Sequence, residues 1–109
     1  VFDVRFLPNP FYVAELKNHT GKEKVVQDFV MQAPEAVEFM SKIMDLLLFL
    51  IPNYIKEGKN QLVIAVGCTG GKHRSVTLSD RIYRELTATE NSVRIEHRDI
   101  DRDSKMPGT

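Results

Sequence analysis

The chain has 109 residues, of which 42% are hydrophobic and 28% are charged. This composition is typical of a soluble globular protein and excludes a disordered, fibrous or membrane class. Fifteen basic residues balance fifteen acidic ones, so no overall field attracts the chain to nucleic acid or to an anionic membrane. The length predicts one domain of residues 1–103. Residues 104–109 are expected to be a flexible tail, either native or added for expression.

The first part of the chain predicts a strand and a short helix. Apolar and polar residues alternate over residues 2–6, which indicates a strand that ends at the proline-containing loop of residues 8–10. Thr20 and Glu23 then have the spacing of a capping box. We therefore expect a helix from this point to about Gln32.

A longer helix is predicted to begin at Pro34, a residue that suits the first helical turn. Its apolar residues recur at helical spacing: Val37, Met40, Ile43, Met44, Leu47 and Leu48. Because residues 49–51 are also apolar, this end should be covered almost all round, by the sheet or by another subunit. A homo-oligomer is therefore predicted. Pro52 is expected to kink or restart the helix.

The second half of the chain predicts a parallel sheet. Residues 62–66 form a continuous β-favouring run, which is typical of a strand buried on both faces. A helix follows to about Leu86, and residues 93–96 alternate as a third strand. The predicted fold is α/β, with the order β-α-α-β-α-β and helices packed on a small parallel sheet. Ligands bind where the carboxyl ends of such strands meet, and the loop after residue 66 lies there.

That loop predicts an anion-binding site. It reads Cys68-Thr69-Gly70-Gly71-Lys72-His73-Arg74-Ser75. A glycine-rich turn between a strand and a helix directs the unpaired N–H groups and the positive end of the helix dipole to one point. Arg74 offers a planar fork for two phosphate oxygens, Lys72 a mobile charge, and the two hydroxyl residues further donors. The alternative is a glycine-rich helix start that only packs closely against the sheet.

The same turn resembles the phosphate loop of cysteine-dependent phosphatases. Five residues separate Cys68 from Arg74, and Ser75 follows. In such an enzyme the thiolate attacks phosphorus and the arginine holds the equatorial oxygens. An aspartic acid on a neighbouring loop would protonate the leaving group, and Asp99 is predicted to lie nearer to this edge than Asp3. Gly67 stands where those phosphatases usually carry a histidine, so catalysis is the lesser alternative.

Other polar residues at the same edge are candidate ligand contacts. His73 lies within the loop, while His97 and Arg98 follow the predicted third strand, and each either contacts the ligand or faces solvent. Asn9, between two prolines, either presents its amide to the ligand or bonds its own turn. The histidines and the single cysteine show no metal-ligand spacing, so no metal is expected.

The cysteine content and the start of the chain give expectations for the cell compartment and for the length of the whole protein. Cys68 is the single cysteine, which excludes an internal disulfide and, without a signal-peptide pattern, favours the cytoplasm. The most apolar stretch, residues 43–51, is too short to span a bilayer, so no membrane partner is expected. A chain that opens at Val1 directly on a strand pattern is expected to be part of a longer protein.

Two motifs together resemble a known family. They are Asp3-Val4-Arg5-Phe6-Leu7-Pro8-Asn9-Pro10, followed by Thr20-Gly21, and Gly67-Cys68-Thr69-Gly70-Gly71-Lys72-His73-Arg74-Ser75-Val76. Over about its first hundred residues the chain resembles the carboxy-terminal domain of the RapZ/YvcJ family of bacterial nucleotide-binding proteins. The resemblance implies an amino-terminal P-loop domain for ATP or GTP in the longer protein, and no cofactor in this domain.

For function, the resemblance implies a cytoplasmic regulator of amino-sugar and cell-envelope metabolism that binds a phosphorylated or nucleotide-linked amino sugar. The ligand contacts it implies are Asn9, Cys68, Thr69, Gly70, Gly71, His73 and Arg74. Enterobacterial relatives are adapters that present small regulatory RNAs to an endoribonuclease. Phe11 stands where those adapters have histidine, and residues 99–103 are acidic, which disfavours RNA. A ligand-sensing domain therefore leads, and its partner for signalling is a regulatory protein or an RNA.

Overall fold

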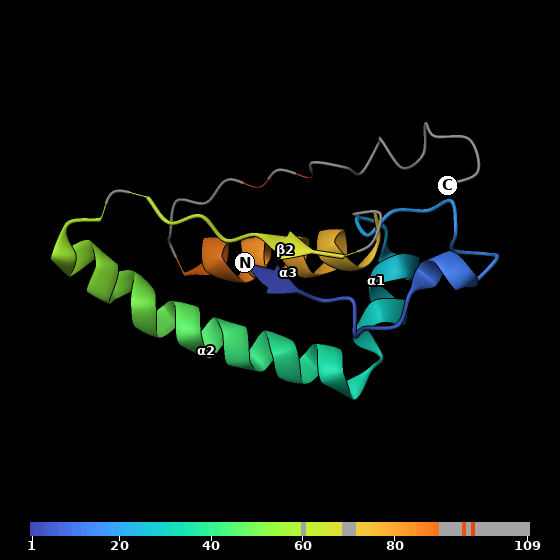
Figure 1. The fold of residues 1–109 in the computed structure, drawn as a ribbon, viewed down its shortest axis with the longest axis horizontal. Coiled ribbons are helices and arrows are strands. Elements are labelled where there is room, and N and C mark those ends of the chain that lie inside the picture. Colours follow the sequence, from blue (N-terminus) through green and yellow to red (C-terminus); the bar gives the residue numbers. More distant parts are fainter. Residues whose placement is uncertain (60, 69–71, 90–94, 96, 98–109) are drawn as a thin grey trace.

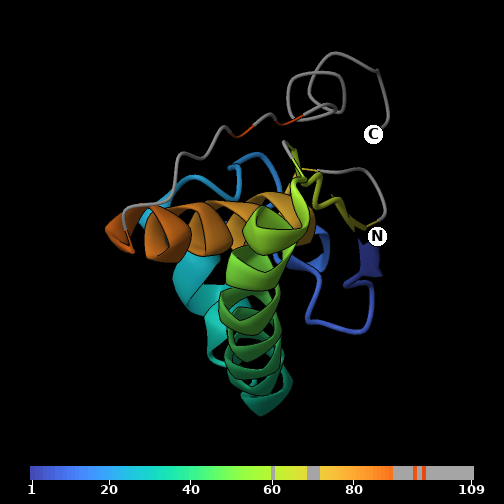
Figure 2. The same cartoon turned by 90° about the vertical axis from the view of Figure 1, so that its left-hand side faces the viewer.

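The structure is a computed structural model that describes residues 1–59, 61–68, 72–89, 95 and 97. Its elements are β1 (Phe2–Asp3), the 3-10 helix η1 (Pro10–Tyr12), α1 (Lys24–Met31), α2 (Pro34–Glu57), β2 (Val66–Gly67) and α3 (Arg74–Ala88). Helix α3 packs against β2, and the three α-helices pack against one another. Figures 1 and 2 show the long helix α2 beneath α3, with the two short strands beside α3.

The two strands form a parallel pair. Phe2 is opposite Val66, and Asp3 is opposite Gly67. The hydrogen bond from Val4 N to Gly67 O, at 2.9 Å, continues this pairing beyond β1. Parallel strands need a long crossover, which α1 and α2 supply here. The α/β class and the parallel pairing are therefore confirmed.

The second strand is shorter and more exposed than the sequence predicted. Within residues 62–66, only Val66 is in a strand, Leu62 is 38% exposed and Val63 is 75% exposed. The prediction of a strand buried on both faces is therefore wrong. Such burial needs helices packed over both faces of the strand, and among the described helices α3 is the one that packs closely against β2. Of the predicted third strand only Ile95 is described, so the full order of six elements stays a prediction.

Helix α1 begins just after Glu23 and ends at Met31, as the capping pattern predicted. The Glu23 carboxylate accepts a hydrogen bond from Thr20 N at 2.7 Å. The Thr20 hydroxyl instead accepts from Lys22 N at 3.3 Å. Half of the capping box is therefore formed, and it fixes the turn that precedes α1.

Helix α2 begins at Pro34 as predicted, but it continues as one helix through Pro52 to Glu57. It ends at Gly58, whose φ of 95° is the left-handed conformation that glycine favours after a helix. The predicted restart at Pro52 is therefore wrong, while a kink at Pro52 stays a prediction. Pro52 lacks the N–H that would bond Leu48 O, but both residues are exposed, so water can satisfy that carbonyl group.

The apolar side chains of α2 divide between the core and the surface. Met40, Ile43, Met44 and Leu47 are buried, whereas Val37, Leu48, Phe49 and Ile55 are 57%, 44%, 66% and 66% exposed. The prediction that this chain covers the end of α2 almost all round is therefore wrong. The neighbouring elements pack along one side of the helix. In the described part of the chain, none of the helices is long and apolar enough to cross a membrane.

Leu78 in α3 provides a test of this core because its side chain is fully buried. We expect Leu78→Ala to lower the free energy of unfolding by about 2–5 kcal/mol, through lost burial and a residual cavity. Leu46 in α2 is 44% exposed, so Leu46→Ala should change stability by less than about 1 kcal/mol. Urea unfolding followed by circular dichroism measures both. Equal losses would place Leu78 outside the core.

Candidate anion-binding site at the start of helix α3

A run of polar residues is buried where α3 begins. Lys72, His73, Arg74 and Ser75 are only 4–7% exposed. Side chains with charges are rarely buried to this degree unless they have a function or a partner. The run follows β2 and Cys68 along the chain, in agreement with the predicted strand–turn–helix. The predicted contacts Thr69, Gly70, Gly71, Arg98 and Asp99 lie outside the described residues, so their roles stay predictions.

The thiol of Cys68 lies against the first turn of α3. Ser75 N donates a hydrogen bond to Cys68 Sγ at 3.3 Å. The first N–H groups of a helix have no acceptor within the helix, so they bind side chains, water or anions. The half-buried thiol thus takes a position at the positive end of the α3 dipole.

Arg74 connects α3 to the segment that follows β1. Its Nη1 donates to Arg5 O at 2.6 Å and to Leu7 O at 3.3 Å. Its buried Nε has no hydrogen-bond partner among the described residues. The guanidinium charge also reaches Asp3, where it is one of the influences that lower the pKa of the carboxyl. The Nη1 group of the Arg74 guanidinium therefore binds the protein backbone, and its Nε–H remains available for a ligand.

A depression of about 350 Å³ lies beside the strand pair. It is lined by Val1, Phe2, Asp3, Arg5, Gly67 and Cys68. The Arg5 side chain donates to Asp3 Oδ2 at 2.8 Å, and this hydrogen bond is the main cause that lowers the pKa of Asp3. The depression therefore has a carboxylate that stays ionised near neutral pH. Sequence analysis did not include Asp3 among the ligand contacts.

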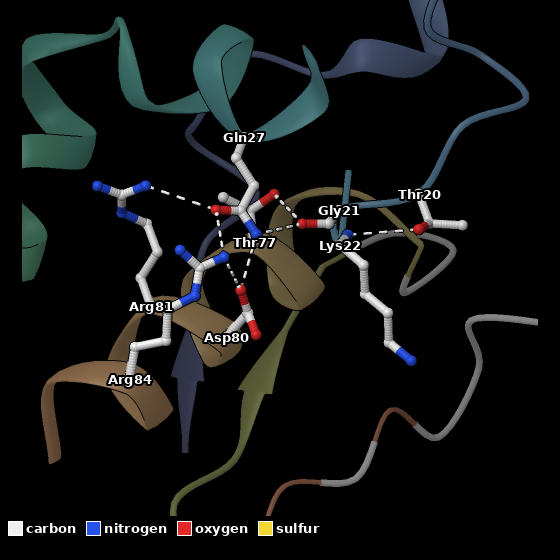
Figure 3. A network of polar contacts seen from close by, with 8 residues as sticks. All are labelled: Thr20, Gly21, Lys22, Gln27, Thr77, Asp80, Arg81 and Arg84. Atoms are coloured by element: carbon white, nitrogen blue, oxygen red, sulfur yellow. Dashed lines mark hydrogen bonds and ion pairs between the residues drawn. The ribbon is translucent and has the colours of Figure 1, made fainter. Parts of the chain in front are cut away.

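Gly21 brings a second loop onto the start of α3. Gly21 N donates to Lys72 O at 2.9 Å. A Cβ at this position would lie 2.3 Å from His73 O and 2.7 Å from Thr77 N, so only glycine fits. Figure 3 shows the neighbouring Lys22 side chain extending from this loop. The Thr20-Gly21 pair in the sequence motif was the only signal of this packing.

His97 lies within reach of charges from two other elements. Burial is the main cause that lowers its pKa, the positive charge of Lys22 lowers it further, and the carboxylate of Asp80 opposes them. His97 is therefore near the Gly21 loop and the first half of α3. A ligand contact from His97 stays a prediction.

Asn9 forms a hydrogen bond within its own turn. Its side-chain oxygen accepts from Phe11 N at 3.1 Å and caps η1. Of the two roles left open for Asn9, this is the local one, and the side-chain NH₂ group remains for another partner. Among the described residues, no group of three or more potential metal-ligating side chains is arranged around one point.

The fold is a small α/β domain in which a run of buried polar and charged side chains lies at the start of α3. The family model described as the RapZ C-terminal domain matches residues 1–101, and the chain belongs to this family. The predicted resemblance is thus confirmed.

Similar proteins called nucleotide-binding protein occur in several bacteria. The Clostridium kluyveri protein is 58% identical over 96% of this chain, and the one from Ruminiclostridium cellulolyticum is 59% identical over 99%. The protein from Lachnoclostridium phytofermentans is 63% identical over 94%. The chain spans 36–37% of the length of these relatives.

The placement of His97 predicts how its pKa responds to neighbouring charges. By NMR titration, we expect the His97 pKa below its ordinary value of 6.5. Lys22→Met should raise it, because a repelling charge is removed. Lys24→Met, which removes an exposed lysine paired with Asp28, should leave it unchanged.

The same shift predicts a stability effect. Since the pKa of His97 is lower in the folded state, the unfolded state binds the proton more readily, and stability falls as the pH drops below 6.5. Lys22→Met should weaken this loss. An identical pKa in both lysine variants would contradict the placement of Lys22 beside His97.

Proposed function

We propose that this domain binds a phosphorylated or nucleotide-linked amino sugar at the start of α3 and thereby regulates amino-sugar and cell-envelope metabolism. The observation that carries the proposal is Arg74, which is 4% exposed and whose Nε lacks a partner among the described residues. A buried cation is costly unless an anion compensates for lost hydration. Family membership of residues 1–101 supports the same site.

A phosphate group suits the residues around Arg74. The helix start supplies N–H donors and the positive end of a dipole, and Lys72 adds a second buried cation. Ser75 adds a hydroxyl group next to Arg74. These groups are all donors, so a dianionic phosphate satisfies them better than a neutral ligand does.

The amino-sugar part of the ligand is assigned to the depression beside Cys68. Its volume of about 350 Å³ is within the range of about 300–1,000 Å³ usual for small-molecule sites. The ionised carboxylate of Asp3 is a partner for an ammonium group, which an amino sugar carries and a plain sugar lacks. We therefore propose that Asp3 selects for the amino group.

In the longer protein, we expect a P-loop domain that binds ATP or GTP and a cytoplasmic location. A regulatory protein or RNA would receive the signal. The RNA-adapter alternative has weaker support because basic and acidic residues balance over the chain. Self-association stays a prediction, and the exposed Val37, Leu48 and Ile55 of α2 are the surface we assign to it.

The proposed anion contact predicts a loss of affinity in Arg74→Lys. A lysine keeps the charge but lacks the planar fork, so binding of glucosamine 6-phosphate should weaken by about 1–3 kcal/mol. Isothermal titration calorimetry measures this, and Lys56→Arg, an exchange of the same two residue types at an exposed position of α2, is the control. Wild-type protein should also bind glucosamine 6-phosphate more tightly than glucose 6-phosphate.

Two results would contradict the proposal. One is unchanged affinity in Arg74→Lys when circular dichroism shows a folded protein. The other is no binding of glucosamine 6-phosphate by the wild type at millimolar concentrations. Equal affinities for the two sugar phosphates would reject only the role of Asp3.

A phosphatase is the second candidate, because Cys68 Sγ accepts the hydrogen bond from Ser75 N. Cysteine nucleophiles of such enzymes are found at helix starts of this kind. Under the binding proposal, p-nitrophenyl phosphate should be hydrolysed no faster by the wild type than by Cys68→Ser. A wild-type rate that is lost in Cys68→Ser would instead establish the enzyme.

A further inference from the structure

We infer that Gln27 of α1 is a positioning residue for the anion site, because it locks the Gly21 loop onto the start of α3. The inference rests on the proposed function for its effect on the ligand. Gln27 lies on the apolar side of α1 between Val26 and Val30, yet its own side chain is only 3% exposed. A buried amide of this kind needs all its hydrogen bonds to be satisfied.

The Gln27 amide has a partner for every hydrogen-bonding position. Its Nε2 donates to Gly21 O at 2.8 Å and to Asp80 Oδ2 at 2.9 Å. Its Oε1 accepts from Arg84 Nη2 at 3.2 Å and from Arg81 Nη1 at 3.5 Å. Figure 3 shows this amide between the Gly21 loop and α3. An amide has two N–H donors and two acceptor sites, so none is left over.

This set of partners allows only one orientation of the amide. A flipped group would bring its NH₂ to the two arginines and its oxygen to the Asp80 carboxylate, and both contacts would repel. Asp80 is also ion-paired with Arg84. Residues of α3 therefore fix the orientation of the Gln27 amide, and the amide in turn binds the carbonyl oxygen of Gly21.

Gly21 connects the Gln27 amide to the proposed site through its own backbone hydrogen bonds. Besides the bond from Gln27, its carbonyl oxygen accepts only a long contact from Thr77 Oγ1, at 3.4 Å, among the described residues. Its N–H bonds Lys72 O, within the buried polar run. Without the Gln27 donor, this buried carbonyl would be poorly satisfied, and the loop would be free to leave α3. Lys72 and Lys22 would then lose their fixed positions.

Two substitutions at Gln27 separate positioning from stability. Gln27→Met has a similar length and removes all four bonds. Gln27→Glu keeps an acceptor for Arg81 and Arg84 but removes the donor to Gly21 and to Asp80. We expect both to weaken binding of inorganic phosphate about 3- to 10-fold, as for a lost neutral hydrogen bond. Gln27→Glu should be no more stable than Gln27→Met, because its carboxylate also faces the Asp80 carboxylate.

Val30→Ala is the matched control, since Val30 is a fully buried residue of α1 with no part in the polar network. It should destabilise the domain through lost burial while keeping phosphate affinity within about twofold. Calorimetry with inorganic phosphate and urea unfolding measure both quantities. Should Gln27→Met fail to fold, Gln27→Glu carries the test.

Amide hydrogen exchange tests the positioning without any ligand. The Gly21 amide should exchange faster in Gln27→Met and Gln27→Glu than in Val30→Ala, relative to amides of α2. Wild-type phosphate affinity in both Gln27 variants, or unchanged Gly21 exchange, would overturn the inference. If the wild type itself does not bind phosphate, the proposed function fails, and Gly21 exchange alone then decides the role of Gln27.

Discussion

The contact between Arg74 and the carbonyl oxygens of Arg5 and Leu7 is the constraint on which the rest of the structure depends. It joins the segment after β1 to the first turn of α3, across almost seventy residues of sequence. The strand pair and α3 are thereby held in one arrangement, with Cys68 between them. A guanidinium can do this because its donors point in several fixed directions, so it can bind backbone and still face a ligand.

A second group of contacts supports this arrangement from the side of α1. Gly21 lies against the backbone of α3 with no space for a side chain, and Gln27 satisfies its carbonyl oxygen. These are polar contacts inside an otherwise apolar packing of three helices. Their directionality gives a fixed position to the loop, which apolar packing alone specifies less sharply. The site thus combines a sheet edge, a helix start and a loop from another part of the chain.

Much of the local structure could be predicted because its causes are local. Pro34 begins α2, and the Thr20–Glu23 pattern precedes α1, as expected from the geometry of helix starts. The exposure of Val63 and the continuous course of α2 through Pro52 could not be predicted. Both depend on which neighbours surround a segment, and apolar or helix-breaking residue types carry no information on those neighbours.

The sequence by itself determined the α/β class, the family and the turn in which Cys68 and Arg74 lie, because residue types and spacing specify strands, helices and dense motifs. Only the tertiary structure decided that Arg74 also binds backbone carbonyls, that Asp3 lines the depression, and that Gln27 is buried with its amide fully hydrogen-bonded. Gln27 follows Val26 in an ordinary amphipathic helix, and nothing in its neighbours along the chain predicts its burial. The partners of its amide come together only when α1 packs on α3; they are Gly21, Asp80, Arg81 and Arg84. A polar side chain can be buried only where folding supplies its hydrogen bonds, and the local sequence does not specify these partners.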